Sequence, residues 1–285
     1  MLVFALGKFD ALHLGHRALV DQASQRGEAA LLTFSGMAEV LGWSPRPPLL
    51  APEDRRRVLD QWRVSERCLP FAELRALAPA AFLAHLVALG AGAVVVGEDF
   101  RFGRDRAAGV AELPALAAAC GLAWVVVPAV QCDGAPVSSS RIRSAIAAGD
   151  VALAARLLGR PYRLCGTVGR GDGRGRLLGF PTANCVQLAN QPPGAGVYAA
   201  QAWLGAHGPW PAAVNAGHGP TVSGQRPFTV EAHLIGFNAD CYGEPMALEL
   251  CQWLREERRF LSLEALKTQI AADVALAAGG NSAIQ

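Results

Sequence analysis

The sequence lacks the features that mark membrane, secreted and nucleic-acid-binding proteins. No apolar stretch reaches about 18 residues without a polar interruption, so we expect no transmembrane helix. No basic segment precedes an apolar run and a cleavage site near residue 1, so we expect no signal peptide. The formal net charge is only +2 and no long basic run occurs, which argues against a nucleic-acid partner. We therefore expect a cytoplasmic protein with small-molecule substrates and no membrane partner.

Paired cysteines are missing as well. The seven cysteines are scattered without a Cys-x-x-Cys pair, and their spacings fit no zinc site. We interpret them as buried thiols in a reducing compartment. Two short clusters that contain arginine, residues 55–57 and 255–259, are interpreted as solvated helix faces.

Apolar residues, by contrast, are abundant. They make up 52% of the 285 residues, enough to bury a sizeable core in two ordinary domains or one large domain. In the first half, short apolar strands alternate with helices, which predicts a parallel sheet wound by crossovers. The expected strands are residues 2–6, 29–34, 93–96 and 123–127. The expected helices are residues 15–25, 52–62, 79–89 and 110–120.

The pattern changes near residue 158. Two short helices, residues 140–147 and 151–158, precede the break at Gly159-Arg160-Pro161. Several short strands with turn-rich connections follow, which predicts a small antiparallel β-barrel. Those strands are residues 162–168, 197–203, 212–215, 228–235 and 246–253. A helix at residues 262–277 and a frayed end at residues 279–285 complete the chain. We predict two domains, 1–158 and 159–285.

The most informative segment joins the first expected strand to the first expected helix. It runs from Gly7 to His16 and reads GKFDALHLGH. In such sheets ligands bind at the carboxyl ends of the strands, and a helix N-terminus offers N–H groups to phosphate. Glycines permit a close backbone approach, and two imidazoles can donate to phosphate oxygens as charge builds on them. Two other interpretations stay open: a zinc-binding pair without an evident third ligand, and two incidental histidines.

This segment resembles the G-x-F-D-x-x-H-x-G-H signature of the nucleotidyltransferase superfamily with a Rossmann-like fold. Residues 97–104 (GEDFRFGR) and 137–143 (VSSSRIR) follow in the order of the FMN adenylyltransferase module of the prokaryotic bifunctional riboflavin kinase/FAD synthetase family. The resemblance implies catalytic roles for His13, His16 and Arg141, whose guanidinium can hold phosphate by two hydrogen bonds. It implies nucleotide binding by Gly7, Phe9, Asp10, Gly15, Asp99, Phe100, Ser138 and Ser139.

A second motif lies in the other half. Residues 173–184 read GRGRLLGFPTAN, where the Thr182 hydroxyl and the Asn184 amide are hard oxygen ligands suited to Mg²⁺. A glycine-rich loop alone would equally suit a β-hairpin turn, but the whole string resembles the riboflavin kinase motif. The resemblance implies that Glu231 accepts the proton of the ribityl hydroxyl, the alternative being an outward residue facing water. The implied binding residues are Gly173, Gly175, Gly179, Pro181 and Asn215.

The resemblance covers residues 3–273 and implies two reactions in sequence. The barrel would convert riboflavin and ATP to FMN and ADP. The N-terminal domain would convert FMN and ATP to FAD and pyrophosphate, and both steps need Mg²⁺ in the family.

Several positions depart from the family pattern. Ser35-Gly36-Met37-Ala38 follows Thr33-Phe34 where the family has T-F-x-P-H-P. Lys8 and Ala11 replace the more usual Asn and Gly, and Gly219 stands where an arginine is usual. Two alternatives therefore stay open. One is a riboflavin kinase whose nucleotidyltransferase domain is degenerate or takes another nucleotide or acceptor. The other is a non-catalytic flavin-binding regulator, against which the retention of Glu231 and Thr182 argues.

Overall fold

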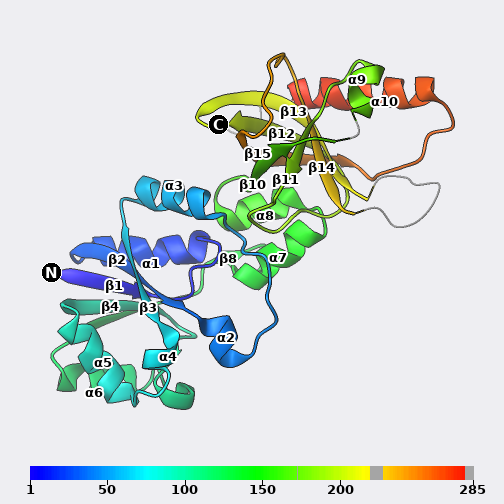
Figure 1. The fold of residues 1–285 in the computed structure, drawn as a ribbon. Helices are drawn as coiled ribbons and strands as arrows, with labels where there is room; N and C mark the ends of the chain where they lie inside the picture. Colours follow the sequence, from blue (N-terminus) through cyan, green and yellow to red (C-terminus); the bar gives the residue numbers. More distant parts are fainter. Residues whose placement is uncertain (172, 219–226, 280–285) are drawn as a thin grey trace. The chain divides into compact units, whose positions relative to one another are not determined.

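The computed structural model describes residues 1–171, 173–218 and 227–279. The chain divides into two compact units, and each is considered by itself (Figure 1). The first unit comprises Met1–Arg46 and Arg55–Ser138, and the second comprises Pro47–Asp54 and Ser139–Gln285. The domain boundary near residue 158, which the sequence predicts, stays a prediction.

The first unit is built on a five-stranded sheet in the order β3-β2-β1-β4-β7, with every neighbouring pair parallel. Its strands are β1 (Leu2–Leu6), β2 (Glu28–Ser35), β3 (Ser65–Pro70), β4 (Ala91–Gly97) and β7 (Ala123–Val127). Its main helices are α1 (Leu14–Ser24), α3 (Pro52–Trp62), α5 (Pro79–Ala88) and α6 (Leu113–Ala119). α1 lies on one side of the sheet and α5 and α6 on the other (Figure 1).

The burial of β1 explains why the strands of the first half are short, continuous apolar runs in the sequence. Phe4 and Leu6 belong to the cluster that includes Leu83 and Leu113 on the helices α5 and α6. Val3, on the opposite face of the strand, is equally buried at 0% exposure. A parallel strand covered on both faces must be apolar at every position, so the expected α/β fold class is confirmed.

Two features of this unit differ from the prediction. β3 is an additional strand with no apolar pattern, because it is a polar edge strand (SERCLP) whose residues are mostly exposed. α6 begins at Leu113 rather than near residue 110, and a proline lies in its first turn, where the missing N–H is tolerated. Smaller elements complete the unit: α2 (Met37–Leu41), α4 (Phe71–Leu74), the 3₁₀ turn η1 (Arg104–Arg106), and the hairpin strands β5 (Arg101–Phe102), β6 (Ala108–Gly109), β8 (Gln131–Cys132) and β9 (Ala135–Pro136).

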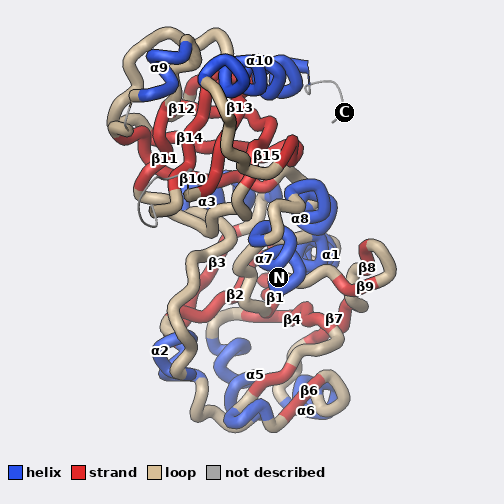
Figure 2. The backbone as a smooth tube through the Cα atoms, turned by 90° about the vertical axis from the view of Figure 1, so that its right-hand side faces the viewer, coloured by secondary structure: helices blue, strands red, loops and turns tan. Residues whose placement is uncertain are grey.

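The second unit contains a closed antiparallel barrel in the order β10-β11-β14-β13-β12-β15 (Figure 2). Its strands are β10 (Tyr162–Gly169), β11 (Ala183–Val186), β12 (Gly196–Leu204), β13 (His207–Gly217), β14 (Thr229–Leu234) and β15 (Pro245–Arg255). Its helices are α7 (Ser139–Ala147), α8 (Val151–Leu158), α9 (Arg174–Leu178) and α10 (Leu263–Gly279). The expected barrel and final helix are confirmed. The short strand β11 and the helix α9 are additional to the prediction, and residues 280–285 of the expected frayed end lie outside the described residues.

The interpretation of two side-chain groups needs correction. Arg55 and Arg255 are not simply solvated, because each forms an ion pair, with Glu66 and with Asp273 respectively. All seven cysteines are free, but Cys185 alone is buried, five are intermediate and Cys68 is exposed. Burial raises the pKa of Cys185 to about 12, with the charge of Cys165 as a smaller cause. Among the described residues, no helix is long and apolar enough to cross a membrane.

Asn190 connects several backbone groups inside the second unit, and it is 1% exposed. Its amide oxygen accepts from the backbone N–H of Cys165 at 2.9 Å. Its amide nitrogen donates to the Tyr162 hydroxyl at 2.9 Å and to the carbonyls of Arg163 at 2.9 Å and Leu49 at 3.3 Å. One buried side chain thus ties β10 to the segment 47–54.

We predict that Asn190→Ala destabilises the protein by about 2–4 kcal/mol, because it leaves several buried polar groups without partners. Urea denaturation of the purified variant measures this. Gln252→Ala, at an exposed position on β15, is the control and should change the free energy of unfolding by less than about 0.5 kcal/mol. An equal effect of the two substitutions would contradict the prediction.

Candidate active sites

Two predicted loops of the first unit follow strands that are neighbours in the sheet. Residues 7–13 follow β1, and Glu98-Asp99-Phe100 follows β4, which ends at Gly97. β1 and β4 pair with each other, and the strand order reverses between them. The crevice at such a point, beside the carboxyl ends of the strands, is where open α/β sheets bind ligands. The fold therefore places both motifs at one edge of the sheet.

The two motif histidines form the start of α1 together. His13 is the N-cap residue: its Nδ1 accepts from the backbone N–H of His16 at 3.3 Å. Reciprocally, the Nδ1 of His16 accepts from the backbone N–H of His13 at 3.4 Å. The rings stack with centroids 3.6 Å apart. Because each Nδ1 accepts, a neutral ring carries its proton on Nε2, which is then the donor that each histidine can direct to a phosphate.

The turn before the histidines adopts a rare backbone shape. Phe9 and Leu12 have positive φ values of 50° and 47°, which side chains other than glycine seldom adopt. Phe9 is fully buried, and its ring lies 4.8 Å from the ring of His16. A Cβ on Gly7 would lie only 3.2 Å from the Phe9 ring. Phe9 thus shapes the turn, and its expected part in nucleotide binding stays a prediction.

The other predicted residues of this half are distributed around the same edge. Gly15 lies in the first turn of α1, and the carbonyl of Val137, which precedes Ser138, is 3.9 Å from where its Cβ would be. Asp99 is exposed, with its carboxylate folded back over Gly97. Phe100 packs against the core beside Phe102. Ser139 and Arg141 begin α7, which belongs to the second unit, so their part in this site stays a prediction.

A row of polar side chains crosses the barrel of the second unit. Asn184 on β11 and Asn215 on β13 are both directly opposite Glu231 on β14. Directly opposed residues of antiparallel strands point to the same face. The neighbours of Glu231, Val230 and Ala232, are buried in the barrel, so the three polar residues face outward as one group.

The strand β11 is preceded by the glycine-rich motif, which brings Thr182 to this row. Its hydroxyl donates to the Glu231 carboxylate at 3.3 Å. The turn before it is anchored by His233, whose Nδ1 lies 2.8 Å from the Pro181 carbonyl. Since a carbonyl only accepts, His233 carries its proton on Nδ1. His233 is not predicted from the sequence, although its position two residues after Glu231 places it on the same face of β14.

The motif contains a short helix where the sequence indicates a glycine-rich loop. Residues 174–178 form the short helix α9, with Gly173 and Gly179 at its ends at φ values of 69° and 90°. Inside it, a Cβ on Gly175 would overlap the Phe180 carbonyl, so only glycine fits there. The glycines therefore permit a compact turn before Thr182. Gly219 and the Pro-Thr pair after it lie outside the described residues.

A second carboxylate, not predicted from the sequence, contacts the row. The Asn215 amide nitrogen donates to Glu257 at 3.1 Å. A Cβ on Gly217 would overlap the Glu257 carboxylate, so the glycine of the Asn-x-Gly segment makes room for it. Glu257 lies in the connection between β15 and α10, some 40 residues from its partner, and no local pattern indicates such a contact.

The donor set of this site fits Mg²⁺. The Thr182 hydroxyl just before β11, the Asn184 amide on β11 and the Glu231 carboxylate on β14 are all hard oxygen donors, the type that Mg²⁺ prefers. The Asn184 amide lies against Gly171, where a side chain would overlap it. Among the described residues no group of three or more His, Cys, Asp or Glu residues could hold a metal, so the zinc interpretation of His13 and His16 finds no third ligand.

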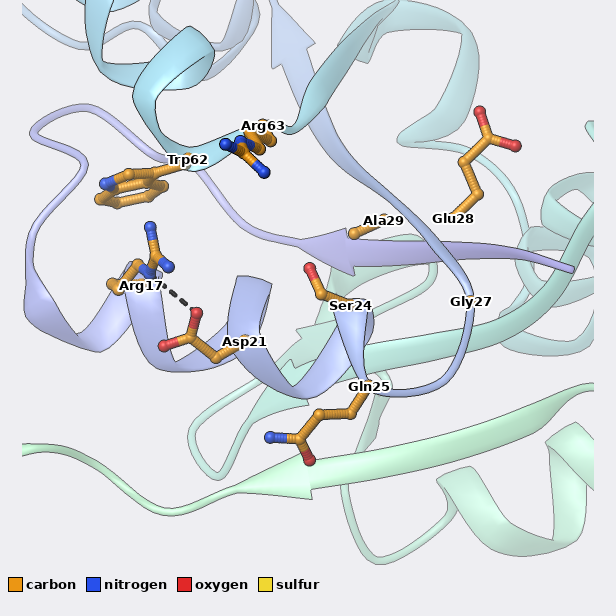
Figure 3. Close-up of a pocket in the computed structure, with 9 residues that line it drawn as sticks. All are labelled: Arg17, Asp21, Ser24, Gln25, Gly27, Glu28, Ala29, Trp62 and Arg63. Atoms are coloured by element: carbon orange, nitrogen blue, oxygen red, sulfur yellow. Dashed lines mark hydrogen bonds and ion pairs between the residues drawn. The ribbon is translucent and has the colours of Figure 1, made fainter.

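A shallow hollow in the first unit lies apart from these motifs. It is lined mainly by Arg17, Asp21, Ser24, Trp62 and Arg63, near the amino end of β2 (Figure 3). Arg17 pairs with Asp21 at 2.7 Å and lies 5.5 Å from the Trp62 ring (Figure 3). The opposite edge of the sheet carries the motif loops, so we assign no substrate to this hollow.

Comparison with known proteins decides the family. A family model described as FAD synthetase matches residues 1–141, and one described as Riboflavin kinase matches residues 158–279. A bifunctional riboflavin kinase/FMN adenylyltransferase of Pseudomonas fluorescens is 36% identical over 96% of this chain and 91% of its own length. The chain belongs to the bifunctional riboflavin kinase/FMN adenylyltransferase family. The family and enzyme class expected from the sequence are confirmed.

Other relatives match either nearly the whole chain or a part of it. The Bacillus subtilis member of the family is 35% identical over 95% of this chain and 90% of its own length. FAD synthetase 2, chloroplastic, of Arabidopsis thaliana is 40% identical over 70% of this chain, which spans 59% of that protein. A solved structure titled a macrolide-efflux protein from Streptococcus pneumoniae has a TM-score of 0.87 and 30% identity, covering 97% of this chain and 93% of that one.

The capping geometry of His13 allows its contribution to stability to be separated from its contribution to the rate of FAD formation. His13→Asn keeps a side-chain acceptor for the His16 N–H but lacks the Nε2–H donor, whereas His13→Ala loses both. We expect both variants to lose about a hundredfold in FAD formation from FMN. Only His13→Ala should also lose about 1 kcal/mol of stability. Rates by chromatography and urea denaturation test this, and near-normal FAD formation by His13→Asn would contradict it.

Proposed function

We propose that this enzyme makes FAD from riboflavin in two ATP-dependent steps and that the steps are divided between its halves. The barrel half phosphorylates riboflavin to FMN, and the N-terminal half adenylylates FMN. The division follows the matches of the two family models to residues 158–279 and 1–141. The row Asn184, Glu231 and Asn215, with Thr182 bonded to Glu231, is the observation that carries the kinase assignment. A cytoplasmic location stays a prediction.

In the kinase step, Glu231 accepts the proton of the ribityl hydroxyl as that oxygen attacks the γ-phosphate of ATP. Phosphoryl transfer depends mainly on positioning and electrostatics, so no covalent enzyme intermediate is needed. The hydroxyl of Thr182 donates to one Glu231 oxygen, which orients the carboxylate and leaves its other oxygen to accept the proton. Gly173, Gly175 and Gly179 shape the turn that receives the phosphates, with Pro181 held by His233.

Thr182 and Asn184 are the side chains that would hold Mg²⁺, since both supply neutral oxygens beside a carboxylate. The ion, when bound with ATP, supplies positive charge that offsets the charge on the transferred phosphate. Asn215 completes the row, and its amide nitrogen is directed to Glu257.

In the adenylyl step, the phosphate of FMN attacks the α-phosphate of ATP and pyrophosphate leaves. His13 and His16 donate from Nε2 to oxygens that gain charge, as their Nδ1 atoms are occupied by backbone N–H groups. Gly15 lets the nucleotide approach the α1 N-terminus, whose partial positive charge favours phosphate. Ser138 supplies a further donor, and Gly7, Asp10 and Asp99 follow β1 and β4 at the same edge of the sheet.

One observation favours a second candidate, a changed acceptor or nucleotide in the N-terminal half. Lys8, at a position where the family more often has Asn, places its ammonium 4.3 Å from the Trp43 ring centroid. Burial, and to a smaller extent the charge of Arg106, lowers the pKa of Lys8. Gly36, in the loop that lacks the family's Pro and His, takes a left-handed φ of 70° to start α2. These features alter the surroundings of the motif loop without removing His13 or His16.

A product assay separates the two candidates. Purified enzyme is incubated with riboflavin, Mg²⁺ and either ATP or CTP, and the products are identified by mass. FAD formed with ATP supports both proposed steps. FMN alone, or another dinucleotide, supports a kinase with a repurposed transferase domain. Absence of any product would contradict the proposed function and favour a non-catalytic flavin-binding protein.

We predict that Glu231→Gln abolishes FMN formation and leaves FAD formation from supplied FMN within about twofold of wild type, because the amide cannot accept the hydroxyl proton. His16→Ala should show the converse. Chromatography of flavin products measures both rates. Glu264→Gln, at an exposed position on α10, is the control and should leave both activities unchanged. Loss of both activities, or of neither, in Glu231→Gln would contradict the assignment.

A further inference from the structure

Arg55 joins three separate parts of the first unit. From α3, its Nε and Nη2 donate to the two carboxylate oxygens of Glu66 on β3 at 2.9 and 2.5 Å. Its Nη1 donates to the backbone carbonyl of Phe9 at 2.6 Å. The buried hydroxyl of Thr33 on β2 donates to the same Glu66 at 2.9 Å. One guanidinium therefore connects a carboxylate on the edge strand to the turn that follows β1.

The residue that Arg55 holds is the one with the unusual backbone. Phe9 has a φ of 50°, a conformation that a non-glycine residue keeps only when its surroundings impose it. Three residues later Leu12 has a φ of 47°, and His13 then starts α1. The carbonyl of Phe9 lies inside this turn, so its position is linked to where His13 and His16 begin. A short, charged hydrogen bond is well suited to fix it.

The arrangement argues against a direct role of Arg55 in phosphate binding. Three of its N–H groups are directed to Glu66 and Phe9, and the ion pair neutralises its charge. Burial alone would raise the pKa of Glu66, but the hydrogen bonds and charge of Arg55, together with Thr33, outweigh it and lower that pKa. The Arg55 and Glu66 side chains are only 22% and 23% exposed. The pair is thus ionised at neutral pH and directed inward, toward the turn.

We infer that Arg55 and Glu66 are positioning residues for adenylyl transfer, which hold the turn of residues 7–13 so that the two histidines meet the nucleotide. This inference rests on the proposed function of the N-terminal half. Displacement of a catalytic group by about 1 Å can reduce a rate about a hundredfold. The neighbouring Arg56 is exposed on the same helix and supplies a matched control position.

The experiment compares Arg55→Met with Arg56→Met in the full-length enzyme. We expect Arg55→Met to lower kcat for FAD formation from FMN by about tenfold to a hundredfold. Riboflavin phosphorylation by the same molecules should stay within about twofold, which shows that the chain is folded. Arg55→Lys should recover part of the loss, since one ammonium can contact Glu66 or Phe9 but not span both as the fork does. Arg56→Met should match wild type in both reactions.

A double variant tests whether the pair acts as a unit. If Glu66 acts only by holding Arg55, Arg55→Met with Glu66→Met should lose no more adenylylation than Arg55→Met alone. Additive losses, or a rate for Arg55→Met within about twofold of wild type, would overturn the inference. Equal loss of both activities with a lower Tm would also overturn it, because that result indicates a role in stability only.

Amide hydrogen exchange tests the same inference without reference to activity. Peptides that cover residues 7–14 should exchange about tenfold faster in Arg55→Met than in Arg56→Met, with no change in peptides from the barrel. If wild-type enzyme forms no FAD, the proposed function of this half fails, while the exchange rates still decide whether Arg55 holds the turn. Equal exchange in the two variants would refute that holding role.

Discussion

The pairing register of β11, β14 and β13 determines whether the residues proposed for the kinase step lie on one face of the barrel. Side chains alternate between the two faces of a strand, so a shift of one residue would turn Glu231 into the barrel and Val230 out of it. In the observed register, Asn184, Glu231 and Asn215 share one face. Closure of the barrel leaves no free edge along which this register can slip. A ladder of backbone hydrogen bonds thus aligns three side chains that come from distant parts of the sequence.

In the first unit, the motif side chains are positioned by different interactions. Its motif residues lie in a turn beyond the sheet, where no ladder fixes the backbone. The positions are instead held by hydrogen bonds from side chains to the backbone: His13 and His16 cap each other's N–H groups, and Arg55 holds the Phe9 carbonyl. Such contacts can be removed one at a time without unfolding the sheet. We therefore expect the turn to depend more than the barrel on residues outside the motif.

The sequence predicts those features that depend on local pattern. Covered strands are apolar almost throughout, so the sequence predicts Leu2–Leu6 to the residue and the cores of β2 and β4 to within one or two residues at each end. The sequence does not predict β3, because an edge strand needs no apolar pattern. It does not predict α9 either, because three glycines within seven residues are typical of a loop. Arg55 and Glu257 are missed for another reason. Their roles depend on Phe9 and Asn215, 46 and 42 residues away, and such pairings appear only when the chain is folded.

The chemistry of the two nucleophiles explains why the two halves carry different residues. The ribityl hydroxyl is a neutral alcohol and must lose a proton, so the kinase site needs a base, for which Glu231 is suited. The phosphate of FMN has a second pKa of about 6 and is already an anion at neutral pH, so adenylyl transfer needs no carboxylate base. The N-terminal motif accordingly presents imidazole N–H donors at a helix N-terminus. This arrangement stabilises negative charge, which suits a nucleophile that needs no deprotonation.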